Sequence, residues 1–248
     1  MLRRMRSFGS VELWEPLRKA GYAKPTALQR QVVPLIMSGR DVAVEVEGDS
    51  GKTAAFILPI LARLKRGKAG IKAVVVTSSA ADSRKVKGEF ERFGRVHLLA
   101  LGMGPSDRSE YRSLSRQPDI VVGVPARIID HIRRGNLDFS HLQSVVIDRQ
   151  EAHAGFNDDL RFIFSKLPQK KQTILFSPAF GPDLEPLLAL LKRPVQLPLA
   201  SWRRSAGELT ELYIEVPESG KLNAASALAL AEPPEALLVQ CAPIGTRP

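Results

Sequence analysis

Residues 44–56 read VEVEGDSGKTAAF, and the second half of this stretch has the form of a phosphate-binding loop that leads into a helix. Gly51, Lys52 and Thr53 directly precede the apolar, helix-compatible run AAFILPILARL at residues 54–64. In such a loop a glycine lets the backbone approach a phosphate, a lysine reaches the β- and γ-phosphates, and a threonine hydroxyl binds Mg²⁺. The stretch therefore predicts a strand, a nucleotide-binding loop and a helix in succession.

The first half of the same stretch departs from this pattern. A phosphate-binding loop has a further glycine five residues before Gly51, where this chain has Val46. Asp49 adds a carboxylate to the loop, and a negative charge close to a triphosphate weakens binding unless a cation compensates. The loop by itself leaves two interpretations open, nucleotide binding and a helix start that contains a chance GKT.

The composition is that of a soluble globular protein with a basic surplus. The chain has 248 residues, of which 44 % are hydrophobic and 25 % are charged, enough for one large α/β domain or for one domain plus a fragment. Its formal net charge of +10 favours an anionic partner, with nucleic acid before membrane. A basic protein without such a partner is the alternative.

Cysteine and histidine usage argues against a structural metal. The single cysteine, Cys241, excludes intramolecular disulfides and a cysteine-cluster zinc site, and it indicates a reducing compartment. The four histidines show no paired ligand spacing, so the only metal we expect is Mg²⁺ carried with a nucleotide.

Targeting signals are weak. No apolar run reaches the roughly 18 to 20 residues that a membrane span needs, so we expect no membrane partner and a cytoplasmic location. The basic start MLRRMRSFGS leaves a short organelle-targeting segment as an alternative.

Strand-like and helix-like segments alternate along the first 180 residues. Short β-rich runs are expected at residues 41–46, 72–78, 96–102, 119–125, 144–149 and 172–178, with segments of helical period between them. This alternation predicts an α/β fold with a parallel sheet covered by helices on both faces. Ligands of such folds bind at the carboxyl ends of the strands, where the loops EGDSGKT, VPARI and DRQEAHAGF are expected.

The amino-acid composition changes near residue 194. The stretch KRPVQLPLASWRRSAGE at residues 192–208 is rich in Pro and Arg and is interpreted as a linker. The strand, helix and strand expected after residue 209 cannot form a core of their own, so they must dock on the first domain, pair with another chain, or begin a second domain.

Taken in order, the loops resemble the motifs of one family. GYAKPTALQ at residues 21–29 resembles the Q motif of DEAD-box RNA helicases, and GDSGKT, VPAR, IDRQE and FSPAF follow at the intervals of that family. The resemblance implies a RecA-like three-layer domain over residues 1–200, with a mostly parallel sheet flanked by helices. It also implies that residues 201–248 are a linker and the partial βαβ start of a second RecA-like domain.

The resemblance further implies ATP and Mg²⁺ as ligands and RNA as a partner. Gln29 would hydrogen-bond the adenine edge, and Asp148 would hold Mg²⁺ through water, although a strand-end aspartate can also be a simple cap. The implied nucleotide-binding residues are Gln29, Thr26, Gly48, Ser50, Gly51, Lys52 and Thr53, the Mg²⁺ residues are Thr53 and Asp148, and the RNA-binding residues are Ser78, Ser79 and Arg127.

Several positions depart from the family pattern. Where the family has Asp-Glu-Ala-Asp, this chain has Asp148, Arg149, Gln150 and Glu151, and an arginine cannot take a proton from the attacking water. Glu151, expected within reach of Ser177, and Ser177 itself are the candidate remnants of the catalytic set. The RNA-facing motifs are eroded as well, since SSAADS at residues 78–83 and VPAR at residues 124–127 lack an arginine and a hydroxyl that the family has.

Three functions remain open from the sequence. The preferred one is a degenerate DEAD-box-helicase-like domain that binds ATP, RNA or both, with impaired or absent hydrolysis. The first alternative is an active RNA-dependent ATPase or helicase whose second lobe is missing or supplied in trans. The second alternative is a scaffold that binds no nucleotide and associates with a protein partner through the strands after residue 209.

Overall fold

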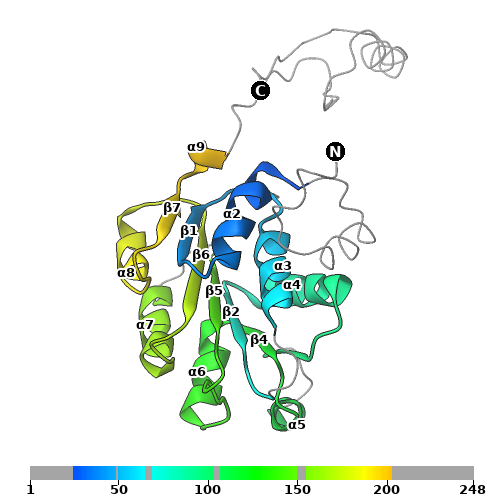
Figure 1. Cartoon of the computed structure of the whole chain (residues 1–248). Coiled ribbons are helices and arrows are strands. Elements are labelled where there is room, and N and C mark those ends of the chain that lie inside the picture. Colours follow the sequence, from blue (N-terminus) through cyan, green and yellow to red (C-terminus); the bar gives the residue numbers. More distant parts are fainter. Residues whose placement is uncertain (1–24, 49, 65–68, 103–106, 150–154, 203–248) are drawn as a thin grey trace, which may run out of the picture. The chain divides into compact units, whose positions relative to one another are not determined.

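The computed structural model describes residues 25–48, 50–64, 69–102, 107–149 and 155–202, which form an α/β domain around one seven-stranded sheet (Figure 1). The strand order is β3-β4-β2-β5-β6-β1-β7, and every pairing between these strands is parallel. The strands are β1 (Val42–Glu45), β2 (Ala73–Thr77), β3 (Leu98–Ala100), β4 (Ile120–Gly123), β5 (Ser144–Asp148), β6 (Gln172–Ser177) and β7 (Val195–Leu197).

Helices connect the strands in the alternation that the sequence predicts. They are α2 (Ala27–Met37), α3 (Lys52–Arg63), α4 (Ala80–Phe93), α5 (Asp107–Ser115), α6 (Pro125–Arg133), α7 (Phe156–Lys166), the 3₁₀ turn η3 (Pro182–Leu184), α8 (Glu185–Leu188) and α9 (Leu199–Trp202). Within the described residues, no helix is long and apolar enough to cross a bilayer.

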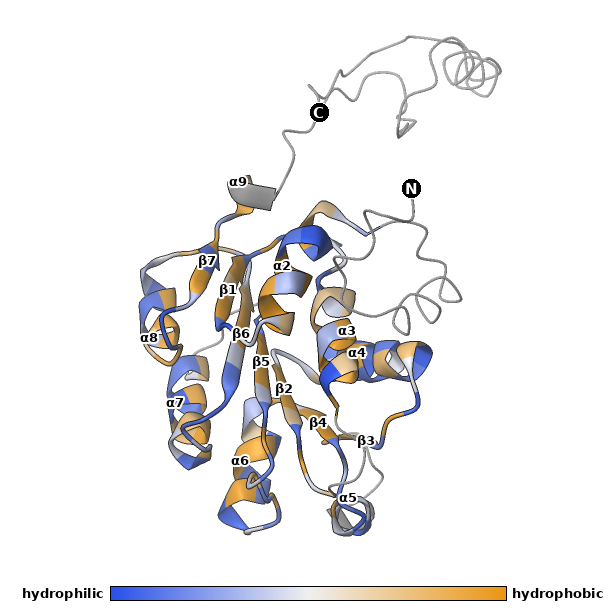
Figure 2. Cartoon of the chain, in the orientation of Figure 1, coloured by the Kyte–Doolittle hydropathy of each residue, from blue (hydrophilic) through white to orange (hydrophobic). Residues whose placement is uncertain are grey.

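The sheet is the middle of three layers. Side chains on one face pack with α2, α3 and α4, and side chains on the other face pack with α6, α7 and α8. On β1, for example, Val42 and Val44 belong to the first core and Ala43 belongs to the second. Burial on both faces explains why the strands are mostly apolar rather than alternating, as the orange parts of the strands in Figure 2 show.

One segment differs from the sequence prediction. The stretch from residue 192 was interpreted as a linker, but β7 pairs with β1 inside it and α9 follows. β7 has only three residues and is flanked by Pro194 and Pro198. Proline cannot donate a ladder hydrogen bond and is tolerated at sheet edges, so a short edge strand between two prolines is easily mistaken for irregular chain.

Some predictions fall outside the described residues. These are the strands expected after residue 209, the division of the chain near residue 200, the first 24 residues with the beginning of the Q motif, and the positions of Asp49, Gln150 and Glu151.

The parallel register brings separate motifs to one edge of the sheet. Asp148 at the end of β5 lies opposite Thr77 of β2 on one side and Phe176 of β6 on the other. Glu45 at the end of β1 lies opposite Ser177 of β6. The loops that follow β1, β2, β5 and β6 therefore start side by side.

Three aromatic rings pack together in the core between the sheet and helices α3 and α4. Phe56 of α3 lies 5.8 Å from Phe176 and 6.4 Å from Phe90 between ring centroids, and all three side chains are fully buried.

We expect Phe56→Ala to lower the free energy of unfolding by about 3 to 5 kcal/mol, measured by urea denaturation. Phe162→Ala, on a half-buried ring of α7, is the control and should cost clearly less; equal losses would contradict this assignment of the core.

Candidate nucleotide-binding site

The turn before α3 requires glycine at its last position. Gly51 is the N-cap of α3 and has φ +79°, a left-handed conformation that disfavours other residues. A Cβ atom on Gly51 would lie 2.7 Å from Nε2 of Gln29 and 3.1 Å from Cγ2 of Thr26. The close approach of these two side chains, together with the backbone conformation, fixes glycine here.

Thr26 and Gln29 hold the loop from the start of α2. They form a capping box, in which the Thr26 hydroxyl accepts the Gln29 backbone N–H and the Gln29 side chain accepts the Thr26 backbone N–H. Beyond the cap, the Thr26 hydroxyl donates to the carbonyl of Ser50 at 3.1 Å, and Gln29 Nε2 donates to the carbonyl of Gly51 at 3.0 Å. The structure thus brings both residues to the loop, while their contact with adenine stays a prediction.

Lys52 and Asp148 form a buried ion pair across the sheet edge. Nζ of Lys52 lies 2.8 Å from Oδ1 of Asp148, and the two side chains are 10 % and 3 % exposed. Burial raises the pKa of Asp148, and the neighbouring Lys52 opposes that rise. The lysine of the loop and the aspartate of the β5 end, predicted separately from the sequence, therefore belong to one site.

An unpaired hydroxyl of the loop fits a phosphate. The hydroxyl of Ser50 is buried and makes no hydrogen bond to any of the described residues, and it stands directly before the N-terminus of the 12-residue helix α3. A free donor at a helix N-terminus suits an anion. Ser50, Gly51 and Lys52 would hold the phosphates of ATP, and Thr53 with Asp148 would hold the Mg²⁺ that neutralises them.

Val46 explains the departure at the front of the loop. Its side chain is 4 % exposed and belongs to the core under α2 and α3. Its N–H donates to the carbonyl of Ser177 at 2.8 Å and so continues the β1–β6 ladder by one residue. The chain uses this position for packing, and the loop turns two residues later, at Gly48 with φ +59°.

Arg149 occupies the position where the family has glutamate, and its guanidinium is engaged within the domain. The residue is 5 % exposed; Nη1 donates to the hydroxyl of Ser177 at 2.9 Å, and Nη2 pairs with the carboxylate of Asp183. The Ser177 hydroxyl donates onward to the carbonyl of Ala179 at 3.0 Å. This network joins the end of β5 to the end of β6 and to η3.

This arrangement bears on two expectations. Ser177, expected to be within reach of Glu151, is instead contacted by Arg149, and Glu151 lies outside the described residues. Asp183 was not predicted as part of the site. It follows β6 by six residues without a recognisable spacing to Arg149, so only the fold reveals the pair.

Ser78 and Ser79 lie beside this site at the end of β2. Ser79 caps α4, accepting the N–H of Asp82 at 3.1 Å and donating to its carboxylate at 2.7 Å. The Ser78 hydroxyl lies 3.5 Å from the carbonyl of Asp148, at the limit of a hydrogen bond. The structure therefore brings these two predicted RNA-binding residues next to Asp148, with the hydroxyl of Ser79 committed to the helix cap.

Arg127, the third predicted RNA-binding residue, is anchored by a buried carboxylate. It lies in the first turn of α6, and its Nη2 is 2.7 Å from Oε2 of Glu110 on α5. The same carboxylate contacts His131 Nε2 at 2.9 Å and accepts the N–H of Gly102. Burial alone would raise the pKa of Glu110, but the hydrogen bonds from His131, Gly102 and Arg127 outweigh it and hold the pKa below its usual value.

Sequence reasoning missed Glu110. In DRSEYRSLS it stands among arginines and serines, a pattern typical of a solvated helix. Nothing local distinguishes it from an exposed glutamate, because its partners come from the turn after β3 and from α6.

The fold and the loop define a domain of the RecA-like class. The model of the DEAD/DEAH box helicase family matches residues 26–186, about two thirds of the chain, and the chain belongs to this family. The DEAD-box ATP-dependent RNA helicase CshA of Geobacillus kaustophilus is 30 % identical over 239 residues, which cover 93 % of this chain and 50 % of that protein. The ATP-dependent RNA helicase DRS1 of Eremothecium gossypii is 35 % identical over 227 residues, covering 85 % and 31 %.

Solved structures agree on the fold. A DEAD box protein from the hyperthermophile Methanococcus jannaschii superimposes with a TM-score of 0.77 at 24 % identity, covering 89 % of this chain and 61 % of that chain. A hypothetical ATP-dependent RNA helicase from Sulfolobus tokodaii gives 0.67 at 27 %, covering 75 % and 56 %. The predicted RecA-like fold is confirmed, and the chain spans half or less of the two curated relatives.

The Lys52–Asp148 pair predicts a stability effect independent of ligand. Lys52→Ala leaves a buried carboxylate without its cation and should lower the free energy of unfolding by about 3 kcal/mol. Adding Asp148→Asn removes the stranded charge, so the double variant should recover part of this loss in urea denaturation. A double variant less stable than the sum of the two single losses would contradict the pairing.

The depressed pKa of Glu110 predicts a pH-dependent stability difference. An ionised Glu110 stabilises the folded state above its unfolded pKa of about 4.3, and this contribution is lost as pH falls through the lower folded pKa. Glu110→Gln should therefore cost about 2 kcal/mol at pH 7, and the gap to the wild type should narrow below about pH 4.3. Denaturation curves from pH 3 to pH 8 measure it; a gap that does not change with pH would refute the charged network.

Proposed function

We propose that this chain is a DEAD-box domain that binds ATP and RNA but hydrolyses ATP poorly or not at all. The observation that carries the proposal is Arg149, which stands at the position of the family's glutamate and is held in the domain by Ser177 and Asp183.

A general base must accept a proton from the attacking water. The guanidinium of Arg149 stays cationic at any relevant pH and has no lone pair to offer. Loss of a positioned base costs about 10²- to 10⁴-fold in rate. The engaged nitrogens of Arg149 also support a structural role at this position, since two of them already bind partners in the domain.

The nucleotide-binding residues support retained binding. Gly51 keeps its conformation, Gln29 keeps its contact with the loop, and Lys52 lies against Asp148 at the strand edge. ATP binding with Mg²⁺ is consistent with the names of the relatives, which are ATP-dependent RNA helicases. RNA is the proposed partner on the same ground and on the net charge of +10.

An active RNA-dependent ATPase is the second candidate. The intact Lys52–Asp148 pair favours it, because these residues would serve turnover as well as binding. It requires a base other than Arg149 and the part of the relatives' length that this chain does not span.

Titration with fluorescent ATP and Mg²⁺ tests the binding half of the proposal. We expect saturable binding by the wild type and its loss in Lys52→Ala, assayed well below the unfolding temperature of that variant. Gln196→Ala, an exposed position on β7, is the matched control and should bind as the wild type does. Equal absence of binding in wild type and Lys52→Ala would refute nucleotide binding and favour a protein-interaction scaffold.

Phosphate release with saturating single-stranded RNA tests the hydrolysis half. We expect the wild type to release phosphate no faster than Lys52→Ala. Release clearly above that level would establish the ATPase alternative. Arg149→Glu paired with Asp183→Asn restores a carboxylate without leaving two acidic groups together, and a rise in rate in this double variant would identify Arg149 as the block.

A further inference from the structure

The amino-terminal ends of three neighbouring strands carry a group of cations. Arg40 precedes β1, Lys170 and Lys171 precede β6, and Lys192 and Arg193 precede β7. Because β6, β1 and β7 are adjacent and parallel, these five residues gather at one end of the sheet, opposite the nucleotide loop. We call this group the basic edge.

A buried aspartate fixes the three segments against one another. The carboxylate of Asp41 accepts the N–H of Thr173 at 2.8 Å and the N–H of Lys192 at 2.7 Å, and its backbone carbonyl accepts the N–H of Val195 at 2.9 Å. The side chain of Gln172 donates to the carbonyl of Arg40 at 2.6 Å. The basic edge is therefore built on a rigid support rather than on independent loops.

The basic edge keeps a surplus of positive charge, because five cations surround the buried carboxylate of Asp41. In the part of the chain that the structure describes, none of its five residues forms an ion pair, and the Asp41 carboxylate is committed to backbone N–H groups. Lys192 and Lys171 donate only to the carbonyls of Gln169 and Pro168, which leaves their positive charge in place. Burial and the charge of Lys192 lower the pKa of Lys171, and the carboxylate of Asp41 opposes part of this shift.

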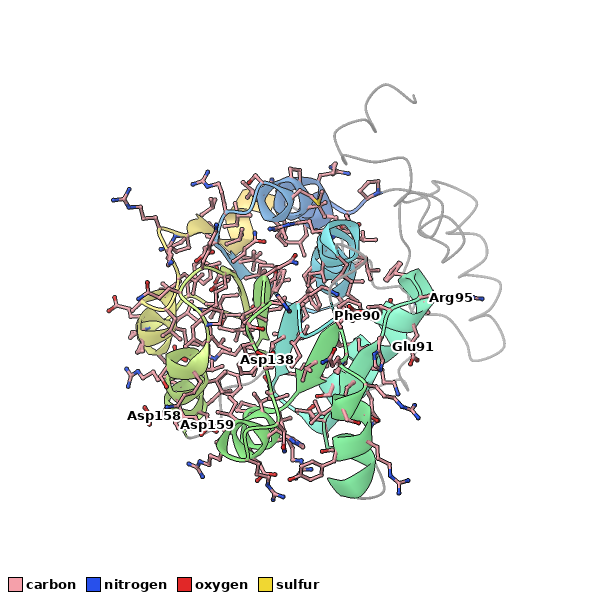
Figure 3. All side chains as sticks on the ribbon, turned by 60° about the horizontal axis from the view of Figure 1, so that its bottom comes forward. Phe90, Glu91, Arg95, Asp138, Asp158 and Asp159 are labelled. Carbon is pink, nitrogen blue, oxygen red and sulfur yellow. The ribbon has the colours of Figure 1, made fainter. Side chains whose placement is uncertain are left out.

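The acidic residues of the adjacent helix lie too far away to compensate. Asp158 and Asp159 lie in the first turn of α7, at the periphery of the view in Figure 3, and Asp158 is paired with Arg161 at 3.1 Å. Lys166 ends the same helix, about 12 Å further along its axis at 1.5 Å per residue. That separation exceeds a Debye length of about 8 Å, so the two aspartates do little to offset the charge at the other end of α7.

We propose that the basic edge is a docking surface for the phosphate backbone of RNA, separate from the loops at the carboxyl ends of the strands. Arg40, Lys170, Lys192 and Arg193 are exposed, so their charges can reach phosphates. All four exposed residues are Lys or Arg, the side chains that contact phosphate oxygens without reading the base sequence. The inference rests on the proposed function only in taking RNA as the nucleic acid.

The size of the effect follows from counterion release. Each phosphate contact on a single strand contributes about 0.7 to the slope of log K against log salt concentration. Removing three cations of the edge should lower that slope by about 2 and weaken binding at low salt about ten- to hundred-fold.

The experiment compares two triple variants of equal charge. The edge variant, Lys170→Gln/Lys192→Gln/Arg193→Gln, removes three charges from the basic edge. The control variant, Arg95→Gln/Arg112→Gln/Arg116→Gln, removes three exposed charges near β3, the strand at the opposite end of the strand order from β7. Figure 3 shows Arg95 extending from the periphery there. The probe is a labelled single-stranded oligouridylate without nucleotide, titrated from 50 to 300 mM KCl.

We expect the edge variant to lose affinity and slope and the control variant to stay within two-fold of wild type. Equal losses in the two variants, or an unchanged slope in the edge variant, would overturn the proposal. A polyglutamate of the same length that displaces the RNA equally well would also overturn it, since the surface would then accept any polyanion.

The outcome is separable from the proposed function. Fluorescent-ATP binding should be the same in the edge variant and the wild type. Failure of the wild type to bind ATP would count against the proposed function and leave the RNA comparison valid, because that comparison uses no nucleotide.

Discussion

The requirement to bury both faces of a parallel sheet governs this domain. Each strand must return through a crossing helix, so the helices α2 to α4 cover one face and α6 to α8 cover the other. The loops after the strands then meet at one edge whatever their separation in sequence. Lys52 and Asp148, almost a hundred residues apart, become a 2.8 Å ion pair for this reason. The opposite edge collects the residues that precede the strands, and at β6, β1 and β7 these include five cations around the carboxylate of Asp41.

The carboxyl edge holds retained and altered residues within one network of contacts. Gly51, Gln29 and Lys52 lie together at the loop after β1. Arg149 follows β5, and Ser177 at the end of β6 lies between it and Glu45 at the end of β1. The altered residue is well accommodated. Ser177 and Asp183 give the guanidinium two acceptors, so the substitution of the family's glutamate did not leave a buried charge alone.

Much of this could be predicted from the sequence, because its signals are local. Apolar runs such as AVVVT and SVVID indicate buried strands, and GKT before an apolar helix indicates a phosphate-binding loop. The features that the sequence did not predict depend on contacts that exist only in the folded chain. β7 is too short and too close to prolines to be recognised, Glu110 looks like a solvated helix residue, and Asp183 has no fixed spacing from Arg149. Asp41 is another such case, because its carboxylate binds backbone N–H groups more than a hundred residues away in the sequence.

The capping box at the start of α2 has a consequence for signalling within the domain. The same two side chains that cap this helix, Thr26 and Gln29, also hold the carbonyls of Ser50 and Gly51. A change of the loop's backbone must therefore strain or release the first turn of α2. The hydrogen-exchange rates of the amide protons in that turn would therefore change when the backbone of the loop changes its conformation.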